Sequence, residues 1–325
     1  MTANCNEAME PVVADFAGQS PARIAKRLFH ATRPKFFPAS VLPVVAGTAW
    51  GVLASGEFGV LVFALALLAT MCVHAGSNVL NDVGDESIGT DRINETRIYP
   101  YTGGSRFIQT GILDASIMAR LGISLLAVAA VCGMFLLMMK GVTVLWFGLA
   151  GVVLGVLYSV GPVKLSTLGV GETAVAVAFG ILPVAGAAWL QGASLNTALL
   201  LFAIPVSAWV AAILLINEVP DIDADAATGK RTLPVRMGLN GTAVLYLAIH
   251  LAAFAAVVLL TVGKALPLLA PLVPLLLLLL AGKASQGIRS GVSDRPAMTR
   301  AIEATLAIHT VGSLWLTACV VFVIF

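Results

Sequence analysis

Nine long runs of apolar residues constrain the fold of this chain more than any other feature. Each run is close to the roughly 20 residues that an α-helix needs to cross about 30 Å of hydrocarbon. The runs cover residues 37–55, 58–80, 117–139, 142–160, 169–190, 197–216, 242–263, 265–282 and 302–324. We therefore expect an all-α, polytopic membrane protein with about nine transmembrane helices in the lipid bilayer.

The few charged residues fall on one side of this expected bundle. If the first span leads outward from a cytoplasmic N-terminus, all 19 Lys and Arg residues except Lys140 and Lys264 lie on the cytoplasmic side. All 17 acidic residues except Glu57 share that side. Because Lys and Arg in short loops are retained in the cytoplasm, we expect a cytoplasmic N-terminus, an outside C-terminus and insertion in the inner (cytoplasmic) membrane. The net charge of +2 lacks the basic surplus of nucleic-acid-binding proteins, so no nucleic-acid partner is expected.

All of the expected spans lie in residues 33–325, and 59% of the whole chain is hydrophobic. We expect a single transmembrane domain over this range, preceded by an N-terminal cytoplasmic tail at residues 1–32. The four cysteines show neither a disulfide framework nor the spacing of a metal site.

The second apolar run ends in a cluster of oxygen-bearing side chains. Asn81 and Asp85 are four residues apart and Asp82 and Asp85 are three apart, so all three crowd one side of a helix end. Asp91 follows soon after. Carboxylates held this close repel each other unless a cation lies between them. Oxygen ligands without nearby Cys or His suit Mg²⁺, which predicts a magnesium site.

The sixth apolar run ends in a matching cluster. Asn217, Asp221 and Asp225 are spaced four apart, which places them on one stripe if the helix continues. Lys230 and Arg231 follow in a basic turn. They are either part of a loop retained by its positive charge or groups that bind phosphate oxygens while the acids hold Mg²⁺.

Four more side chains near the cytoplasmic ends are candidates for binding substrate, namely Arg33, Arg106, Tyr158 and Lys164. Arg106 follows Gly-Gly-Ser, a sequence whose exposed backbone N–H groups suit an anion, although a flexible turn is the alternative. Arg33 is explained equally well as a positive anchor of the first span.

Polar or small residues inside the spans allow further interpretations. Glu172 is either a buried functional carboxylate or the ion-pair partner of Lys164. His74 is interpreted as a structural hydrogen-bonding group and left out of the site. The fourth run repeats small residues at the spacing of helices that pack closely in lipid. These residues are Gly148, Gly151 and Gly155.

The two acidic motifs resemble those of the UbiA superfamily of intramembrane prenyltransferases. The resemblance rests on Asn81-Asp82-x-x-Asp85 with the later Asp91, on Asn217-x3-Asp221-x3-Asp225, and on their places after the second and sixth spans. The segments around both motifs look most like the 1,4-dihydroxy-2-naphthoate polyprenyltransferases of menaquinone synthesis. Two positions depart from the common pattern: Gly89 stands where many relatives have a third acid, and Ala226 where Arg is common.

The resemblance implies a central cavity capped by the two acidic loops and an Mg²⁺-dependent prenyltransferase. Its substrates would be an allylic polyprenyl diphosphate and an aromatic acceptor, most similar to 1,4-dihydroxy-2-naphthoate. The implied catalytic residues are Asp82, Asp85, Asp221 and Asp225. The implied metal ligands are Asn81, Asp82, Asp85, Asp91, Asn217, Asp221 and Asp225. The implied substrate-binding residues are Lys230, Arg231, Arg106, Lys164, Tyr158 and Arg33.

Two alternatives stay open at this point. The first is a member of the same superfamily with another acceptor, such as another quinone precursor, a haem or a chlorophyll-type alcohol. The second and more distant is a cation transporter, since acidic groups in membranes mark ion paths. A path needs polar groups through the membrane depth, and these spans are almost free of charge beyond their cytoplasmic ends.

Overall fold

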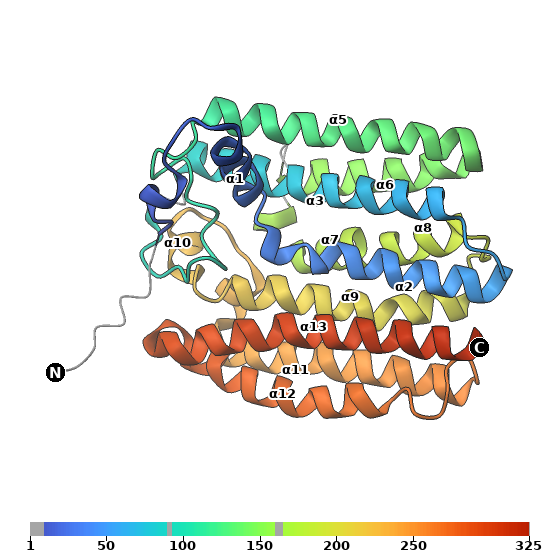
Figure 1. Ribbon diagram of the computed structural model, residues 1–325. Coiled ribbons are helices and arrows are strands. Elements are labelled where there is room, and N and C mark those ends of the chain that lie inside the picture. Colours follow the sequence, from blue (N-terminus) through green and yellow to red (C-terminus); the bar gives the residue numbers. More distant parts are fainter. Residues whose placement is uncertain (1–9, 90–92, 160–164, 325) are drawn as a thin grey trace.

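The computed structural model of the protein describes residues 10–89, 93–159 and 165–324. Within these ranges every regular element is a helix, which confirms the all-α prediction. Figure 1 shows the long helices lying side by side as a bundle, with α1 and α10 at one end and the last turn of α13 at the other. Asp91 and Lys164, both predicted site residues, lie outside the described ranges.

The bundle consists of long apolar helices joined by short ones. The long helices are α2 (Pro38–Ser55), α3 (Val60–Ile88), α5 (Ala115–Lys140), α6 (Thr143–Ser159), α9 (Thr197–Asn217), α11 (Leu233–Val262), α12 (Leu272–Ser290) and α13 (Arg295–Ile324). Between α6 and α9, a composite helix is formed by α7 (Gly171–Ala176), the π-helical turn η4 (Val177–Ile181) and α8 (Leu182–Leu190). The short helices are η1 (Val13–Phe16), α1 (Pro21–Ala31), η2 (Pro34–Phe36), η3 (Leu165–Thr167), α10 (Ile222–Ala227) and η5 (Gly291–Asp294).

Among the described residues, seven helical stretches are long and apolar enough to cross a membrane. The predicted count of nine spans is therefore not confirmed. Two features account for the difference. The α6 helix, which has 17 residues within the described ranges, is not among the seven. The last stretch, Leu272–Val323, joins α12 and α13 through η5 without an interruption.

Several predicted spans differ from the observed helices in their bounds, and in two of them prolines explain the difference. The span expected at 242–263 begins earlier, at Leu233, because Pro234 occupies the first turn, where it is tolerated. That early part is kinked at Gly238, which has a φ of 65°. The span expected at 265–282 begins later, since the residues before α12 include Pro267 and Pro271, which lack the N–H that a helix interior uses.

The α9 helix lies at the centre of the core and packs against α11, α13 and the composite helix. Its Phe202 and Leu215 are fully buried. Because lipid is as apolar as leucine, close packing rather than transfer from water holds such helices together. Gly47 shows this: a Cβ there would lie 2.2 Å from the Val184 carbonyl oxygen, so α2 contacts α8 at a distance that only glycine permits.

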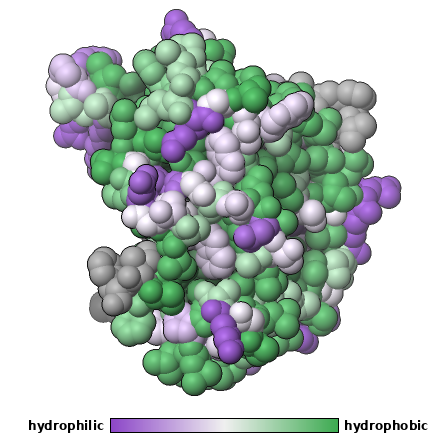
Figure 2. All heavy atoms as spheres, turned by 90° about the vertical axis from the view of Figure 1, so that its right-hand side faces the viewer, coloured by the Kyte–Doolittle hydropathy of each residue, from purple (hydrophilic) through white to green (hydrophobic). Residues whose placement is uncertain are grey.

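The end of the bundle that carries α1 and α10 is closed by the described part of the N-terminal segment and by the loop between α3 and α5. Phe16 is buried with its ring centroid 4.9 Å from that of Phe107. The Glu10 carboxylate forms ion pairs with Arg97 at 2.7 Å and Arg106 at 3.0 Å. Figure 2 shows the opposite end, where hydrophilic residues are scattered among apolar ones.

Candidate active site

The last turns of α3 carry the first acidic motif. The helix continues to Ile88, eight residues past the end of the predicted span. The Asn81 side-chain amide donates a hydrogen bond to Asp85 Oδ2 at 2.7 Å. Asp82 is only 3% exposed; its Oδ2 accepts a hydrogen bond from the backbone N–H of Ser105 at 2.9 Å. Asn81 and Asp85 therefore face the same way, as predicted from their spacing, and both line the large cavity described below. Asp82 is not among the residues that line that cavity.

The second motif does not lie on one continuous helix, which corrects the predicted stripe. The α9 helix ends at Asn217, and the chain turns before α10 begins at Ile222. Pro220 explains the break, because the residue before a proline is disfavoured in the α conformation. Asn217, Asp221 and Asp225 nevertheless all line one cavity, so the turn preserves the grouping that the spacing suggested.

Lys230 joins the two motifs. Its Nζ lies 3.2 Å from Asp85 Oδ1 and 3.5 Å from Asp225 Oδ1. Asp85 and Lys230 are 145 positions apart in the sequence, yet both side chains are largely buried at the same place. The ammonium group thus holds the ends of two distant segments together.

The loop between α3 and α5 connects the motifs a second time. Asn94, which is 3% exposed, donates a hydrogen bond from its side-chain amide to Asp221 Oδ1 at 2.7 Å. The Thr96 hydroxyl donates to the Pro220 carbonyl at 2.6 Å. Sequence reasoning missed Asn94, because a lone Asn in a polar loop belongs to no periodic pattern.

Burial dominates the electrostatics of the second motif. It raises the pKa of Asp221, although the Asn94 hydrogen bond and Lys230 oppose the rise. It raises the pKa of Asp225 to about 6, with Lys230 again opposing and the neighbouring carboxylates adding to the effect. Burial alone would lower the pKa of Lys230, but Asp85 and Asp225 outweigh it and raise that pKa. The site concentrates negative charge where water is scarce, an arrangement that favours bound cations.

A cavity of about 1540 Å³ lies beside both motifs. Its polar end is lined by Asn81, Asp85, Asn94, Asn217, Asp221, Asp225 and Lys230. Arg33 and Tyr158 also line it, and the Arg33 guanidinium donates to the Tyr101 carbonyl at 3.1 Å. Away from the polar end, the lining consists mainly of apolar side chains and glycines from α3, α5, α6 and α8. The cavity therefore combines a charged end with a long apolar part.

Two predicted substrate-binding residues lie elsewhere. Arg106 is not among the cavity-lining residues, and its guanidinium contacts Glu10. Arg231 is exposed; its backbone N–H donates to the Thr167 carbonyl and its own carbonyl accepts from Arg236 Nε. The structure thus brings Arg33, Tyr158 and Lys230 to the cavity but not Arg106 or Arg231.

Glu172 caps a helix. Its Oε1 accepts a hydrogen bond from the Leu233 N–H at 3.2 Å, one of the N–H groups that the first turn of α11 leaves without a helical partner. Its carboxyl also faces Glu218, and burial together with Glu172 raises the pKa of Glu218 well above its usual range. His74 Nδ1 lies 2.7 Å from Ser40 Oγ, which confirms its interpretation as a structural hydrogen-bonding group.

The donor atoms fit a hard cation. Among the residues that the structure describes, no three Asp, Glu, His or Cys side chains are grouped closely enough to hold a metal by themselves. Mg²⁺ requires only one or two carboxylates and takes its other ligands from water and phosphate. Asp82 Oδ1 and Asn217 Oδ1 are buried without a hydrogen-bond partner, a costly state unless a ligand binds them.

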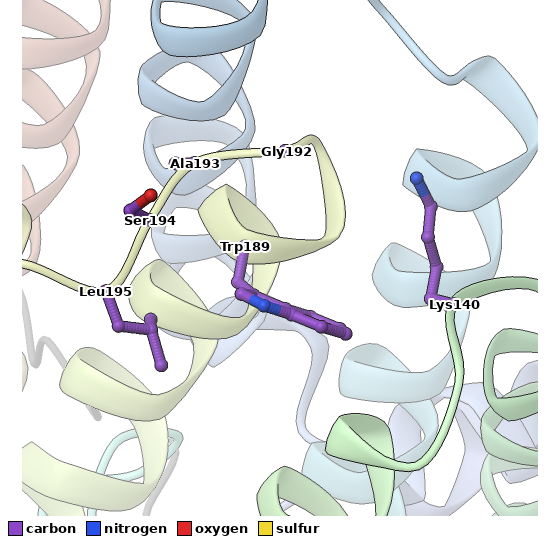
Figure 3. Close-up of a pocket in the computed structure, with 6 residues that line it drawn as sticks. All are labelled: Lys140, Trp189, Gly192, Ala193, Ser194 and Leu195. Atoms are coloured by element: carbon purple, nitrogen blue, oxygen red, sulfur yellow. The ribbon is translucent and has the colours of Figure 1, made fainter.

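A second hollow, of about 570 Å³, lies at the far end of the bundle. Figure 3 shows Trp189 and Lys140 on facing sides of it, beside the loop that carries Ser194 and Leu195. Of its lining residues only Lys140 is charged. It has no group of carboxylates, so the catalytic chemistry is assigned to the larger cavity.

Residues 40–311 match the UbiA prenyltransferase family. The chain belongs to this family. It is 34% identical over 221 residues to the 1,4-dihydroxy-2-naphthoate octaprenyltransferase of Haemophilus influenzae, an alignment that covers 66% of this chain and 70% of that protein. The protein is thus a prenyltransferase with several membrane-spanning helices, and its similarity to naphthoate enzymes confirms the resemblance drawn from the motifs.

Two solved structures share the fold at low sequence identity. One is a UbiA homolog from Aeropyrum pernix K1, with a TM-score of 0.66, 17% identity and coverage of 88% of this chain and 98% of that one. The other is a UbiA homolog from Archaeoglobus fulgidus bound to DMAPP and Mg²⁺, with a TM-score of 0.63, 16% identity and coverage of 90% and 99%.

Proposed function

We propose that the enzyme transfers a polyprenyl group from an allylic polyprenyl diphosphate to an aromatic acceptor, 1,4-dihydroxy-2-naphthoate, in an Mg²⁺-dependent step of menaquinone synthesis. The observation that carries this proposal is the meeting of the two acidic motifs at Lys230, at the polar end of a large apolar cavity. The naphthoate enzyme of Haemophilus influenzae and the Mg²⁺-bound homolog support the acceptor and the metal respectively.

The residues at the polar end bind and orient the diphosphate. Lys230 and Arg33 supply positive charge for its oxygens, and Tyr158 also lines the cavity. The residues that would supply oxygen ligands to Mg²⁺ are Asn81, Asp82, Asp85, Asn217, Asp221 and Asp225, together with Asp91. When bound, Mg²⁺ neutralises the charge that develops on the departing diphosphate.

In the transfer, the allylic C–O bond breaks and the diphosphate leaves with the electron pair. An electron-rich ring carbon of the acceptor then forms the new C–C bond, and the ring loses its carboxylate as carbon dioxide. The chain needs no nucleophilic side chain for this, since charge stabilisation at the leaving group is the main catalytic term. The apolar lining keeps water away from the reactive allyl group.

This proposal includes an orientation in the membrane. The N-terminus and both acidic loops are assigned to the cytoplasm, where soluble diphosphate is released, and the C-terminus to the outside. The catalytic domain is assigned to residues 33–325. Reporter fusions at the two termini test the assignment, and a cytoplasmic signal from the C-terminus contradicts it.

The test of function uses purified protein in nanodiscs with Mg²⁺, a labelled polyprenyl diphosphate and a panel of aromatic acceptors. We expect a prenylated product from 1,4-dihydroxy-2-naphthoate, no product in EDTA, and none from the matched Asp221→Ala variant. Diphosphate release that requires metal but does not depend on any acceptor would reject the assignment. If product forms only with another acceptor, that acceptor takes the place of 1,4-dihydroxy-2-naphthoate in the assignment.

A further inference from the structure

One carboxylate of the N-terminal segment binds two separate parts of the loop between α3 and α5. Glu10 Oε1 accepts hydrogen bonds from the guanidinium of Arg97 at 2.7 Å and from that of Arg106 at 3.0 Å. The side chains of these arginines are only 9% and 8% exposed. Buried charges are costly unless they are paired, and two cations held at one oxygen also repel each other. Glu10 therefore supplies negative charge where two buried cations of the loop meet.

The same segment is held a second time by apolar packing. Phe16 is buried in a cluster that includes Val79 of α3, Phe107 of the loop and Met118 of α5. Figure 1 shows the N-terminal helices and this loop at the end of the bundle that carries α10. Residues 10–16 are thus packed against the loop that contacts both acidic motifs.

Arg97 connects Glu10 with the second acidic motif. Its Nη1 donates a hydrogen bond to the carbonyl of Asn94. The side-chain amide of Asn94 in turn donates to Asp221 Oδ1 at 2.7 Å. Arg295, at the start of α13, donates to the Arg97 carbonyl at 2.6 Å and so holds the backbone of Arg97 as well. Only Arg97 and Asn94 stand between Glu10 and Asp221 in this series of contacts.

Arg106 connects Glu10 with the first acidic motif. It follows Ser105, whose backbone N–H donates to Asp82 Oδ2 at 2.9 Å. Arg106 has a φ of 64°, in the left-handed region that is unfavourable for residues other than glycine. Such a conformation persists only where the surrounding structure fixes it. The Glu10 contact helps to fix Arg106, and with it the stretch of backbone that carries the Ser105 N–H.

We infer that Glu10 is a positioning residue for both acidic motifs. It holds the two loop arginines in place, and through the loop it fixes the donors that contact Asp82 and Asp221. The inference rests on the proposed function, because it takes these two carboxylates as part of the metal and diphosphate site. It also extends the catalytic unit into residues that the sequence assigned to an N-terminal tail.

A positioning role and a simple anchoring role have different consequences. Glu10 is not among the residues that line the large cavity, so a substitution there leaves the space for substrates unchanged. Loss of its charge instead loosens the loop that orients the carboxylates. The effect should therefore appear in kcat and in the Mg²⁺ concentration that gives half-maximal activity, whereas a residue that only anchored the N-terminal segment would change Tm alone.

The first experiment compares Glu10→Gln, which removes the charge, with Glu10→Asp, which keeps it. We expect Glu10→Gln to lower kcat at least tenfold and to raise the Mg²⁺ concentration for half-maximal activity at least threefold. Glu10→Asp should be at least threefold more active than Glu10→Gln, because a carboxylate can still pair with the arginines.

The matched control for this experiment is Asp15→Asn. Asp15 is an exposed acid of the same segment, and its backbone carbonyl accepts hydrogen bonds from Arg23 and Lys26. The substitution removes the same charge as Glu10→Gln and leaves that carbonyl in place. Its kcat and Mg²⁺ requirement should stay within twofold of wild type.

A second measurement needs no catalysis. Hydrogen–deuterium exchange of the amides in residues 94–107 reports how often this loop opens. In nanodiscs without substrate, we expect Glu10→Gln to exchange at least tenfold faster there than wild type, and Asp15→Asn to exchange at the wild-type rate. Size-exclusion profiles and Tm values in detergent identify the folded variants. If Glu10→Gln does not fold, Glu10→Asp decides, with changes in the same direction and of smaller size.

The outcomes separate the inference from the proposed function. Wild-type protein that transfers no prenyl group rejects the proposed function, even if the exchange of the loop depends on Glu10. Wild-type transfer together with a folded Glu10→Gln variant that keeps its kcat, or that keeps the wild-type exchange of the loop, overturns the inference alone. An equal loss in Asp15→Asn also overturns it, because the effect would then come from the charge of the segment and not from the two arginine contacts.

Discussion

The Asn94→Ala substitution tests whether the loop between α3 and α5 positions the second acidic motif. Asn94 is buried and donates to Asp221 Oδ1 at 2.7 Å. Removing it leaves a buried carboxylate oxygen without this donor. A hydrogen bond to a charged group contributes about 1.5–3 kcal/mol, and about 1.4 kcal/mol corresponds to a tenfold change in rate. We therefore expect kcat/KM to fall by roughly 10- to 150-fold.

The assay is the initial rate of prenyl transfer at varied donor concentration, with Mg²⁺ and acceptor saturating. Asn94→Asp should lose more activity than Asn94→Ala, because it places a second carboxylate against Asp221. The matched control is Glu95→Ala, since Glu95 is the exposed neighbour of Asn94 and should stay within twofold of wild type. Folded Asn94→Ala protein with wild-type kcat/KM would refute the positioning role of this loop.

Three further predictions follow from the geometry. Lys230→Met should lower kcat/KM at least a hundredfold. Lys230→Arg should keep only part of the wild-type kcat/KM, because a planar guanidinium cannot reproduce the ammonium geometry. Full activity of the methionine variant would show that the contact of Lys230 with Asp85 and Asp225 is not needed for catalysis. Asp85→Ala and Asp221→Ala should each abolish turnover while the protein still inserts and purifies normally. Activity in either variant would show that the acidic motif carrying that residue is not part of the active site. Gly47→Leu should destabilise the bundle by about 1–3 kcal/mol or more through overpacking against Val184, measured as a lower Tm in detergent, and an unchanged Tm would contradict the close α2–α8 contact.

The helices were predictable because apolar length and sequence position are local properties. The α2 helix, observed at Pro38–Ser55, differs by one residue from the run at 37–55. Other bounds were missed, because hydropathy does not register that Pro234 can start α11 or that the prolines before α12 delay its start. The nine predicted runs become seven stretches because α6 has 17 described residues and because α12 and α13 form one continuous helical stretch.

The two acidic motifs of the site were predictable because their residues repeat at the three- and four-residue spacing of a helix. Asp85 and Asp225 meet at Lys230, as a shared site requires. Contacts that depend on the tertiary structure were not visible in the sequence. Arg106 pairs with Glu10 in the N-terminal segment, and Asn94 contacts Asp221 across 127 positions. The metal and substrate roles of these groups remain predictions.

The central claim is that the two acidic motifs act on one diphosphate. A double-mutant cycle with Asp85→Asn and Asp225→Asn tests it most directly, read out as the Kd of an unreactive allylic diphosphate analogue in the presence of Mg²⁺. Residues that share a ligand show interaction energies of about 0.5–3 kcal/mol, whereas independent sites add within about 0.5 kcal/mol. We predict a coupling of at least about 1 kcal/mol, and additive losses would show that the two motifs bind separately.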